Sequence, residues 1–140
     1  MTQKIPTEKL PESFHSKDSL RLWLRLLSCS MRIEKAIRMR LRSNFDATLP
    51  RFDVMAALER ADEGLTMSEL SAHLLVSNGN VTGLVQRLVQ DGLVERRISP
   101  GDRRIQRVAL TPEGRKTFAV MADGHEQWID NMFSGLTEED

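Results

Sequence analysis

Apolar side chains recur at helical spacing at both ends of the chain. From Asp18 to Asn44 neither Pro nor Gly interrupts the sequence, and the apolar stripe predicts a helix of about seven turns. The stripe consists of Trp23, Leu26, Leu27, Ile33, Ile37 and Leu41. Pro50 is typical of the first position of a helix, so a second helix is predicted to start there. The sequence Ala-Asp-Glu-Gly at 61–64 is predicted to end it.

A second long stripe follows Thr111 and Pro112, which form another cap-and-proline helix start. It consists of Phe118, Met121, Ala122, His125, Trp128, Ile129 and Met132. Both long helices are too apolar on one side to stand alone in water, so each is expected to pack against other helices.

Between these ends lie signals for two shorter helices. Thr66 and Glu69 have the spacing of a capping box, so the first short helix is predicted to begin near Met67. Ser77 is a favourable N-cap for the next helix. The apolar face of that helix comprises Val81, Leu84, Val85 and Leu88.

The opposite face of this second short helix is polar. It comprises Gly79, Thr82, Gly83, Gln86 and Gln90, with Asn80 and Arg87 on its flanks and Asn78 in the first turn. Amide, hydroxyl and guanidinium groups are the kinds of side chain that read base edges or bind phosphates in a major groove. The two glycines would also let the backbone approach DNA closely.

After Gly92 the pattern changes to two short β-prone runs, 93–98 and 103–110, joined by the turn sequence Ser-Pro-Gly-Asp. Residues 86–107 hold six Arg against three acids, a net charge of +3. An arginine at the tip of such a hairpin can enter a narrow minor groove. The whole pattern predicts a mainly α fold with a small β-hairpin wing (α+β), a winged helix-turn-helix that binds double-stranded DNA.

With these residues in place, the chain resembles the MarR family of bacterial transcription regulators. Leu88 to Arg96 match the family's Leu-x-x-x-Gly-Leu-Val-x-Arg pattern. The wing signature D-x-R…L-T-x-x-G is matched by Asp102, Arg104, Leu110, Thr111 and Gly114. The resemblance implies that Arg104 is a minor-groove arginine, that Asp102 holds it in place, and that Arg103 is a neighbouring contact.

The predicted DNA-binding residues therefore come from one helix and one hairpin. They are Ser77, Asn78, Asn80, Thr82, Gln86, Arg87, Asp102, Arg103 and Arg104.

The resemblance also implies a homodimer on an inverted-repeat operator, with half-sites about one helical turn apart. The expected organisation is an N-terminal arm at 1–17, dimerisation helices at 18–48 and 112–140, and a DNA-binding lobe at 50–111. The sequence ends at 140, where members of the family begin another helix, so the last dimerisation helix is expected to be truncated.

Composition narrows the function further. A chain of 140 residues with 40% hydrophobic content can bury the core of a single domain. The sequence has no signal peptide, no apolar run long enough to span a membrane, and a single cysteine, so a cytosolic protein without a disulfide is expected. No metal-ligand spacing and no catalytic motif is visible, which favours a protein that is not an enzyme and has no cofactor.

The charge is unevenly distributed although the chain is neutral overall. Residues 21–51 carry a net charge of +6 and residues 111–140 one of −5. Lys35, Arg38 and Arg42 share one helix face, with Arg32 at its edge. Either this face is solvated and pairs with the acidic C-terminal segment, or it binds an anion such as DNA phosphate or the phosphates of an acyl-CoA.

Members of the family commonly bind a small effector between the dimerisation helices and the DNA-binding lobe. The resemblance favours an aromatic acid or its CoA thioester, whose binding would release a repressor from DNA. The candidate effector-binding residues are Trp23, Arg25, Arg38, Arg42, Arg51, Phe52, Met55, His125 and Trp128. The same residue types also suit an ordinary core and surface.

Two alternative functions stay open. Cys29 lies near the place of the reactive cysteine in peroxide-sensing members of the family, although this chain has no Tyr to support a thiolate and a free Cys is usually a small buried hydrophobe. The other alternative is a winged helix used only for protein contacts or dimerisation, which leaves the arginine-rich hairpin unexplained.

Overall fold

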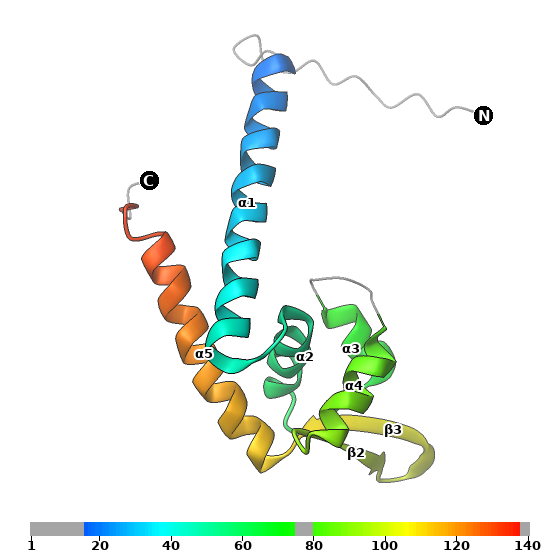
Figure 1. Cartoon of the computed structure of the whole chain (residues 1–140). Coiled ribbons are helices and arrows are strands. Elements are labelled where there is room, and N and C mark those ends of the chain that lie inside the picture. Colours follow the sequence, from blue (N-terminus) through cyan, green and yellow to red (C-terminus); the bar gives the residue numbers. More distant parts are fainter. Residues whose placement is uncertain (1–15, 75–79, 138–140) are drawn as a thin grey trace, which may run out of the picture. The chain divides into compact units, whose positions relative to one another are not determined.

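The computed structural model describes residues 16–74 and 80–137 (Figure 1). Contacts between Cα atoms divide the chain into two units, one ending at Ala36 and the other beginning at Ile37. Helix α1, Ser16–Phe45, runs through this boundary and begins two residues before the predicted start. The long N-terminal helix is therefore confirmed.

The first unit exposes the N-terminal part of the predicted apolar stripe, whereas Ile37 and Leu41 of the same stripe are buried in the second unit. The exposed apolar side chains are Leu20, Leu22, Trp23, Leu24, Leu26, Leu27 and Met31. Even the largest of them, Trp23, is 57% exposed. Among the described residues of this unit, 16–36, these side chains remain exposed.

The second unit holds the other helices and strands (Figure 1). They are α2 (Leu49–Glu59), β1 (Leu65–Thr66), α3 (Met67–His73), α4 (Val81–Gln90), β2 (Val94–Ser99), β3 (Asp102–Leu110) and α5 (Pro112–Met132). This unit also contains the buried core. Helix α2 is central, because it contacts α3, α4, α5 and β3. The fully buried side chains come from almost every element: Leu41, Val54, Met55, Leu58, Leu70, Val85, Leu88, Val94 and Leu110.

Threonine caps set the starts of three helices. The hydroxyl of Thr48 accepts from the Arg51 N–H at 3.3 Å, and that of Thr66 accepts from the Glu69 N–H at 3.2 Å. Thr111 caps α5 in the same way. A Ser or Thr at the N-cap satisfies a free amide of the first turn. The helices begin at Leu49, Met67 and Pro112, which confirms the starts predicted near Pro50, Met67 and Pro112.

The sheet has three antiparallel strands in the order β1-β3-β2. Val94 pairs with Leu110, and the register becomes irregular between Ile98 and Ser99, next to the tip. Gly101 in the tip has φ +102°, a left-handed conformation that glycine adopts without strain. The predicted wing is confirmed, but the short strand β1, whose Leu65 pairs with Val108, was not predicted.

Helix α5 ends at Met132, and a turn follows it. The assignment of 18–48 and 112–140 to dimerisation and of 50–111 to DNA binding stays a prediction. Within the described ranges no helix is long and apolar enough to cross a membrane.

Candidate nucleic-acid interface

Helix α4 presents the polar face that the sequence predicted. Thr82, Gln86 and Arg87 are exposed, and Val85 and Leu88 on the other side are buried. The burial of one side fixes which residues of α4 face outward. A row of amide, hydroxyl and guanidinium groups is thus exposed on α4, and such groups can contact base edges and phosphates in a DNA major groove.

The start of α4 corrects one prediction. The N-cap is Asn80, whose Oδ1 accepts from the Gly83 N–H at 2.9 Å, and not Ser77. Asn is as good an N-cap as Ser, and its side chain folds over Gly83, where a Cβ would lie 2.6 Å from Asn80 Nδ2. Gly83 therefore makes room for the cap, a local reason that the sequence alone did not reveal. The predicted contacts Ser77 and Asn78, and Gly79, lie outside the described residues.

At the tip of the wing, Asp102 and Arg104 are joined as the resemblance implied. Asp102 Oδ1 accepts from the Arg104 backbone N–H at 3.0 Å and from Arg104 Nε at 3.2 Å. The Arg104 side chain is still 91% exposed. Its guanidinium is therefore oriented from one side and open to a ligand on the other, while Arg103 beside it is also exposed. Contact of these residues with DNA stays a prediction.

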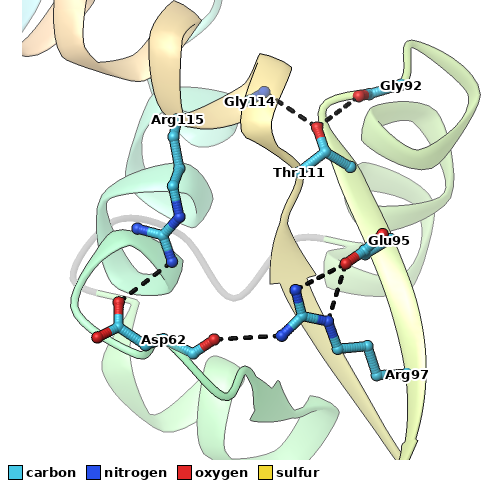
Figure 2. Close-up of polar contacts among 7 residues, drawn as sticks. All are labelled: Asp62, Gly92, Glu95, Arg97, Thr111, Gly114 and Arg115. Atoms are coloured by element: carbon cyan, nitrogen blue, oxygen red, sulfur yellow. Dashed lines mark hydrogen bonds and ion pairs between the residues drawn. The ribbon is translucent and has the colours of Figure 1, made fainter.

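The base of the wing carries a polar network that was not predicted from the sequence (Figure 2). Arg97 on β2 pairs with Glu95 at 2.7 Å and donates to the backbone carbonyl of Asp62 at 3.2 Å. The Asp62 carboxylate in turn accepts from Arg115 of α5 at 3.2 Å. In the sequence Arg97 and Arg115 were only part of a charge pattern, because no local signal links them to the turn between α2 and β1.

The first turn of α5 is also held against the end of α4 (Figure 2). The Thr111 hydroxyl donates to the Gly92 carbonyl at 2.7 Å and accepts from the Gly114 N–H at 3.0 Å. Gly114 is buried, and a Cβ there would overlap the backbone carbonyl of Leu93. The end of α4 and the start of α5 are thus joined by backbone contact as well as by hydrogen bonds.

Three of the predicted effector-binding residues belong to the core. Phe52, Met55 and Trp128 are buried, and the Phe52 ring lies 5.0 Å from the His125 ring, centroid to centroid. Burial lowers the pKa of His125 below its ordinary value, which favours the neutral imidazole. The Trp128 ring packs against the Phe45 ring, with 6.0 Å between the two ring centroids. For these four aromatic or apolar positions the packing role is the one that the structure describes.

The arginines among the candidates lie in a different environment. Arg42 and Arg51 line a hollow of about 380 Å³, together with Arg87 of α4. The remaining lining residues are Asp46, Ala47, Thr48 and Leu84. Arg51 pairs with Asp91 at 3.4 Å, and Asp46 lines the hollow, but the three arginines still leave an excess of positive charge there. From the sequence Arg87 was predicted to contact DNA and was not connected with the other two.

The other candidates lie on α1. Trp23, Arg25 and Arg38 are exposed there, as is Cys29, whose redox role stays untested. Among the residues that the structure describes, no group of His, Cys, Asp and Glu could hold a metal ion.

Comparison with known proteins gives consistent results. Residues 45–105 match the model of the MarR family. The chain is 32% identical over 99 residues to the HTH-type transcriptional repressor IacR of Pseudomonas putida, covering 71% of this chain and 59% of that protein. It is also 32% identical over 104 residues to the transcriptional activatory protein BadR of Rhodopseudomonas palustris, covering 73% and 59%. The chain thus spans about three fifths of the curated relatives named here.

Solved structures show the same architecture. A MarR family transcriptional regulator from Silicibacter pomeroyi superposes with a TM-score of 0.75 at 32% identity, covering 89% of this chain and 85% of that one. Sco3205 of Streptomyces coelicolor, crystallised in complex with DNA, superposes with a TM-score of 0.77 at 23% identity, covering 94% and 83%.

Proposed function

The chain belongs to the MarR family, and from this premise we propose that it is a dimeric regulator that binds operator DNA and is released by a small aromatic acid or its CoA thioester. The family consists of transcriptional regulators, which agrees with the prediction that the chain is not an enzyme. One observation carries the proposal: a helix with a polar exposed face and a wing with an oriented, exposed arginine belong to the same lobe.

In the proposed complex α4 lies in a major groove and the wing tip reaches the adjacent minor groove. Arg104 would then contact a region of enhanced negative potential, with Asp102 holding its guanidinium. Sco3205 of Streptomyces coelicolor, which has the same fold, was crystallised in complex with DNA, and this supports the proposed arrangement.

Dimerisation is proposed through the expected segments 18–48 and 112–140, with 50–111 as the DNA-binding lobe. The exposed apolar side chains of the first unit support it, since a contiguous apolar stripe on a helix usually marks an interface. Two protomers related by a two-fold axis would read an inverted repeat with half-sites roughly 10 bp apart.

Gln86 gives a direct test of base reading by α4. Gln86→Ala should flatten the preference among duplexes that differ at one base pair, by about 1 to 3 kcal/mol at the position it reads, because alanine cannot form the bidentate hydrogen bonds of the amide. Fluorescence anisotropy with a panel of single-substitution operators measures this, and Gln127→Ala on α5 serves as the matched control. An unchanged ranking of the panel would remove Gln86 from the interface.

The effector is proposed to bind in the hollow between Arg42, Arg51 and Arg87. A carboxylate accepts paired hydrogen bonds from arginine, and the phosphates of a thioester need cationic partners such as Arg38 nearby on α1. Because Arg87 lies on α4, an anion that attracts it changes the face that DNA would contact. An effector can release DNA only if it favours a protein state that no longer fits the operator.

A titration tests this coupling. Aromatic acids and their CoA thioesters, added to a labelled operator complex, should weaken operator binding by about 5- to 150-fold, the usual range of allosteric coupling. Arg42→Met should reduce this response, and Arg40→Met, a neighbour outside the hollow, should keep it. Release by peroxide that disappears in Cys29→Ser would overturn the effector proposal in favour of the redox alternative.

The repressor direction is part of the proposal. The name of the Pseudomonas putida relative supports it, whereas the Rhodopseudomonas palustris relative is named as an activator. A reporter gene behind the selected operator should therefore be expressed more strongly when this chain is absent.

A further inference from the structure

We propose that Asp62 is a positioning residue for the wing, which it joins to the first turn of α5. The inference rests on the DNA-binding function proposed above. Asp62 itself contacts neither DNA nor effector and acts on DNA binding through the wing.

Asp62 makes two different contacts from one turn (Figure 2). Its backbone carbonyl accepts from Arg97 Nη1 at 3.2 Å, and its carboxylate accepts from Arg115 Nη2 at 3.2 Å. Arg97 belongs to β2 of the wing and Arg115 to α5. Asp62 therefore joins β2 to α5 at a point separate from the contacts that Thr111 and Gly114 make with Gly92 and Leu93.

The wing needs these acceptors because of its own sequence. Arg97 and Arg107 are directly paired across β2 and β3, and like charges in that position repel each other. Arg97 pairs with the Glu95 carboxylate and donates to the Asp62 carbonyl. Arg107 lies 3.8 Å from the Glu69 carboxylate and donates to the Gly64 carbonyl at 3.3 Å. The turn between α2 and β1 thus supplies a carbonyl to each of the two opposed arginines.

The turn itself is held firmly. Gly64 is buried with φ +86°, and a Cβ there would lie 2.5 Å from the Val108 carbonyl oxygen. The turn therefore lies directly against β3. A change in the position of Asp62 is passed on to the base of the wing.

The first turn of α5 is consequently fastened on two sides. Thr111 binds the Gly92 carbonyl after α4, and Arg115 binds the Asp62 carboxylate beside the wing. Since α5 is a proposed dimerisation helix, the arrangement of the dimer would set the position of the recognition helix and of the wing together. Asp62 is the connection on the wing side.

The decisive variant is Asp62→Asn, because two explanations predict opposite signs. Removing an acid from a DNA-binding lobe should tighten DNA binding if only general charge matters. If Asp62 positions the wing, binding should instead weaken, by about two- to fivefold, the range expected for loss of an exposed ion pair. The Asp62 side chain is 89% exposed, so the variant should fold.

Operator affinity is measured for Asp62→Asn alone and in the Arg104→Ala background. A residue that acts through the wing should have no further effect once the wing arginine is gone, whereas a general loss of structure would weaken binding in both backgrounds. Arg115→Met should reproduce the effect of Asp62→Asn, and Asp62→Glu should restore binding. Two control variants each remove one exposed charge nearby. Glu59→Gln removes a negative charge, as Asp62→Asn does, and Lys116→Met removes a positive charge, as Arg115→Met does.

Unchanged or tighter binding by Asp62→Asn would overturn the inference, as would a loss that persists in the Arg104→Ala background. A wild-type chain that binds no duplex would instead contradict the proposed function itself.

Discussion

Arg104→Ala should weaken binding to every duplex, selected or random, by about tenfold or more. A hydrogen bond to a charged group contributes about 1.5 to 3 kcal/mol, and the exposed guanidinium of Arg104 is the group that the wing offers to DNA. The plot of log affinity against log salt concentration should also become shallower, by about 0.9 for each phosphate that the variant no longer neutralises. Anisotropy titrations at several salt concentrations measure both quantities.

Two variants serve as controls for this result. Asp102→Asn makes the lobe less negative, yet it should weaken binding because Arg104 loses the partner that orients it. Arg103→Ala removes the same charge from the neighbouring position and should have the smaller effect. If Arg104→Ala leaves both affinity and salt slope unchanged, the role assigned to the wing is wrong.

Gly114→Ala should lower the free energy of unfolding by about 2 to 3 kcal/mol. A Cβ at this position would overlap the Leu93 carbonyl and approach Leu110 Cδ2 at 3.3 Å. A backbone carbonyl cannot turn aside as a flexible side chain can, so the loss should reach the upper part of the range for overpacked sites. The hydrogen bond from Thr111 to the Gly92 carbonyl would be strained as well.

Urea unfolding measures this loss. Gly135→Ala is the matched control, because nothing lies within 4 Å of a Cβ at that position. A loss below about 0.5 kcal/mol in Gly114→Ala would show that α5 is not packed against the end of α4 as described.

Local signals explain why the fold could be predicted from the sequence. Thr66 and Thr111 mark the starts of their helices within one turn, and the tip at 99–102 separates two β-prone runs. The period of apolar residues then assigns one face of α4 to the core. Each of these signals lies within a few residues of the structure that it sets.

The features that were missed depend on distant or competing partners. Ser77 and Asn80 are both good N-caps, and the room that Gly83 leaves for the Asn80 side chain is visible only in the structure. Strand β1 has two residues, too few for an alternating pattern, and its partner β3 lies about forty residues later. Asp62 and Arg115 are 53 positions apart, so no spacing in the sequence connects them.

The effector site shows the same limit. Aromatic residues such as Phe52 and Trp128 suit a ligand pocket and a core equally well by sequence, and only their packing assigns them to the core. The hollow beside α4 combines Arg42, Arg51 and Arg87 from three separate helices. Its composition follows from the packing of those helices.

Selection of bound duplexes from a random pool, with the mass of the selected complex measured in solution, tests the central claim most directly. We expect an inverted repeat with half-sites roughly 10 bp apart and two protomers on each duplex. Recovery of no motif, or of a single half-site bound by one protomer, would contradict the proposed dimeric DNA-binding function.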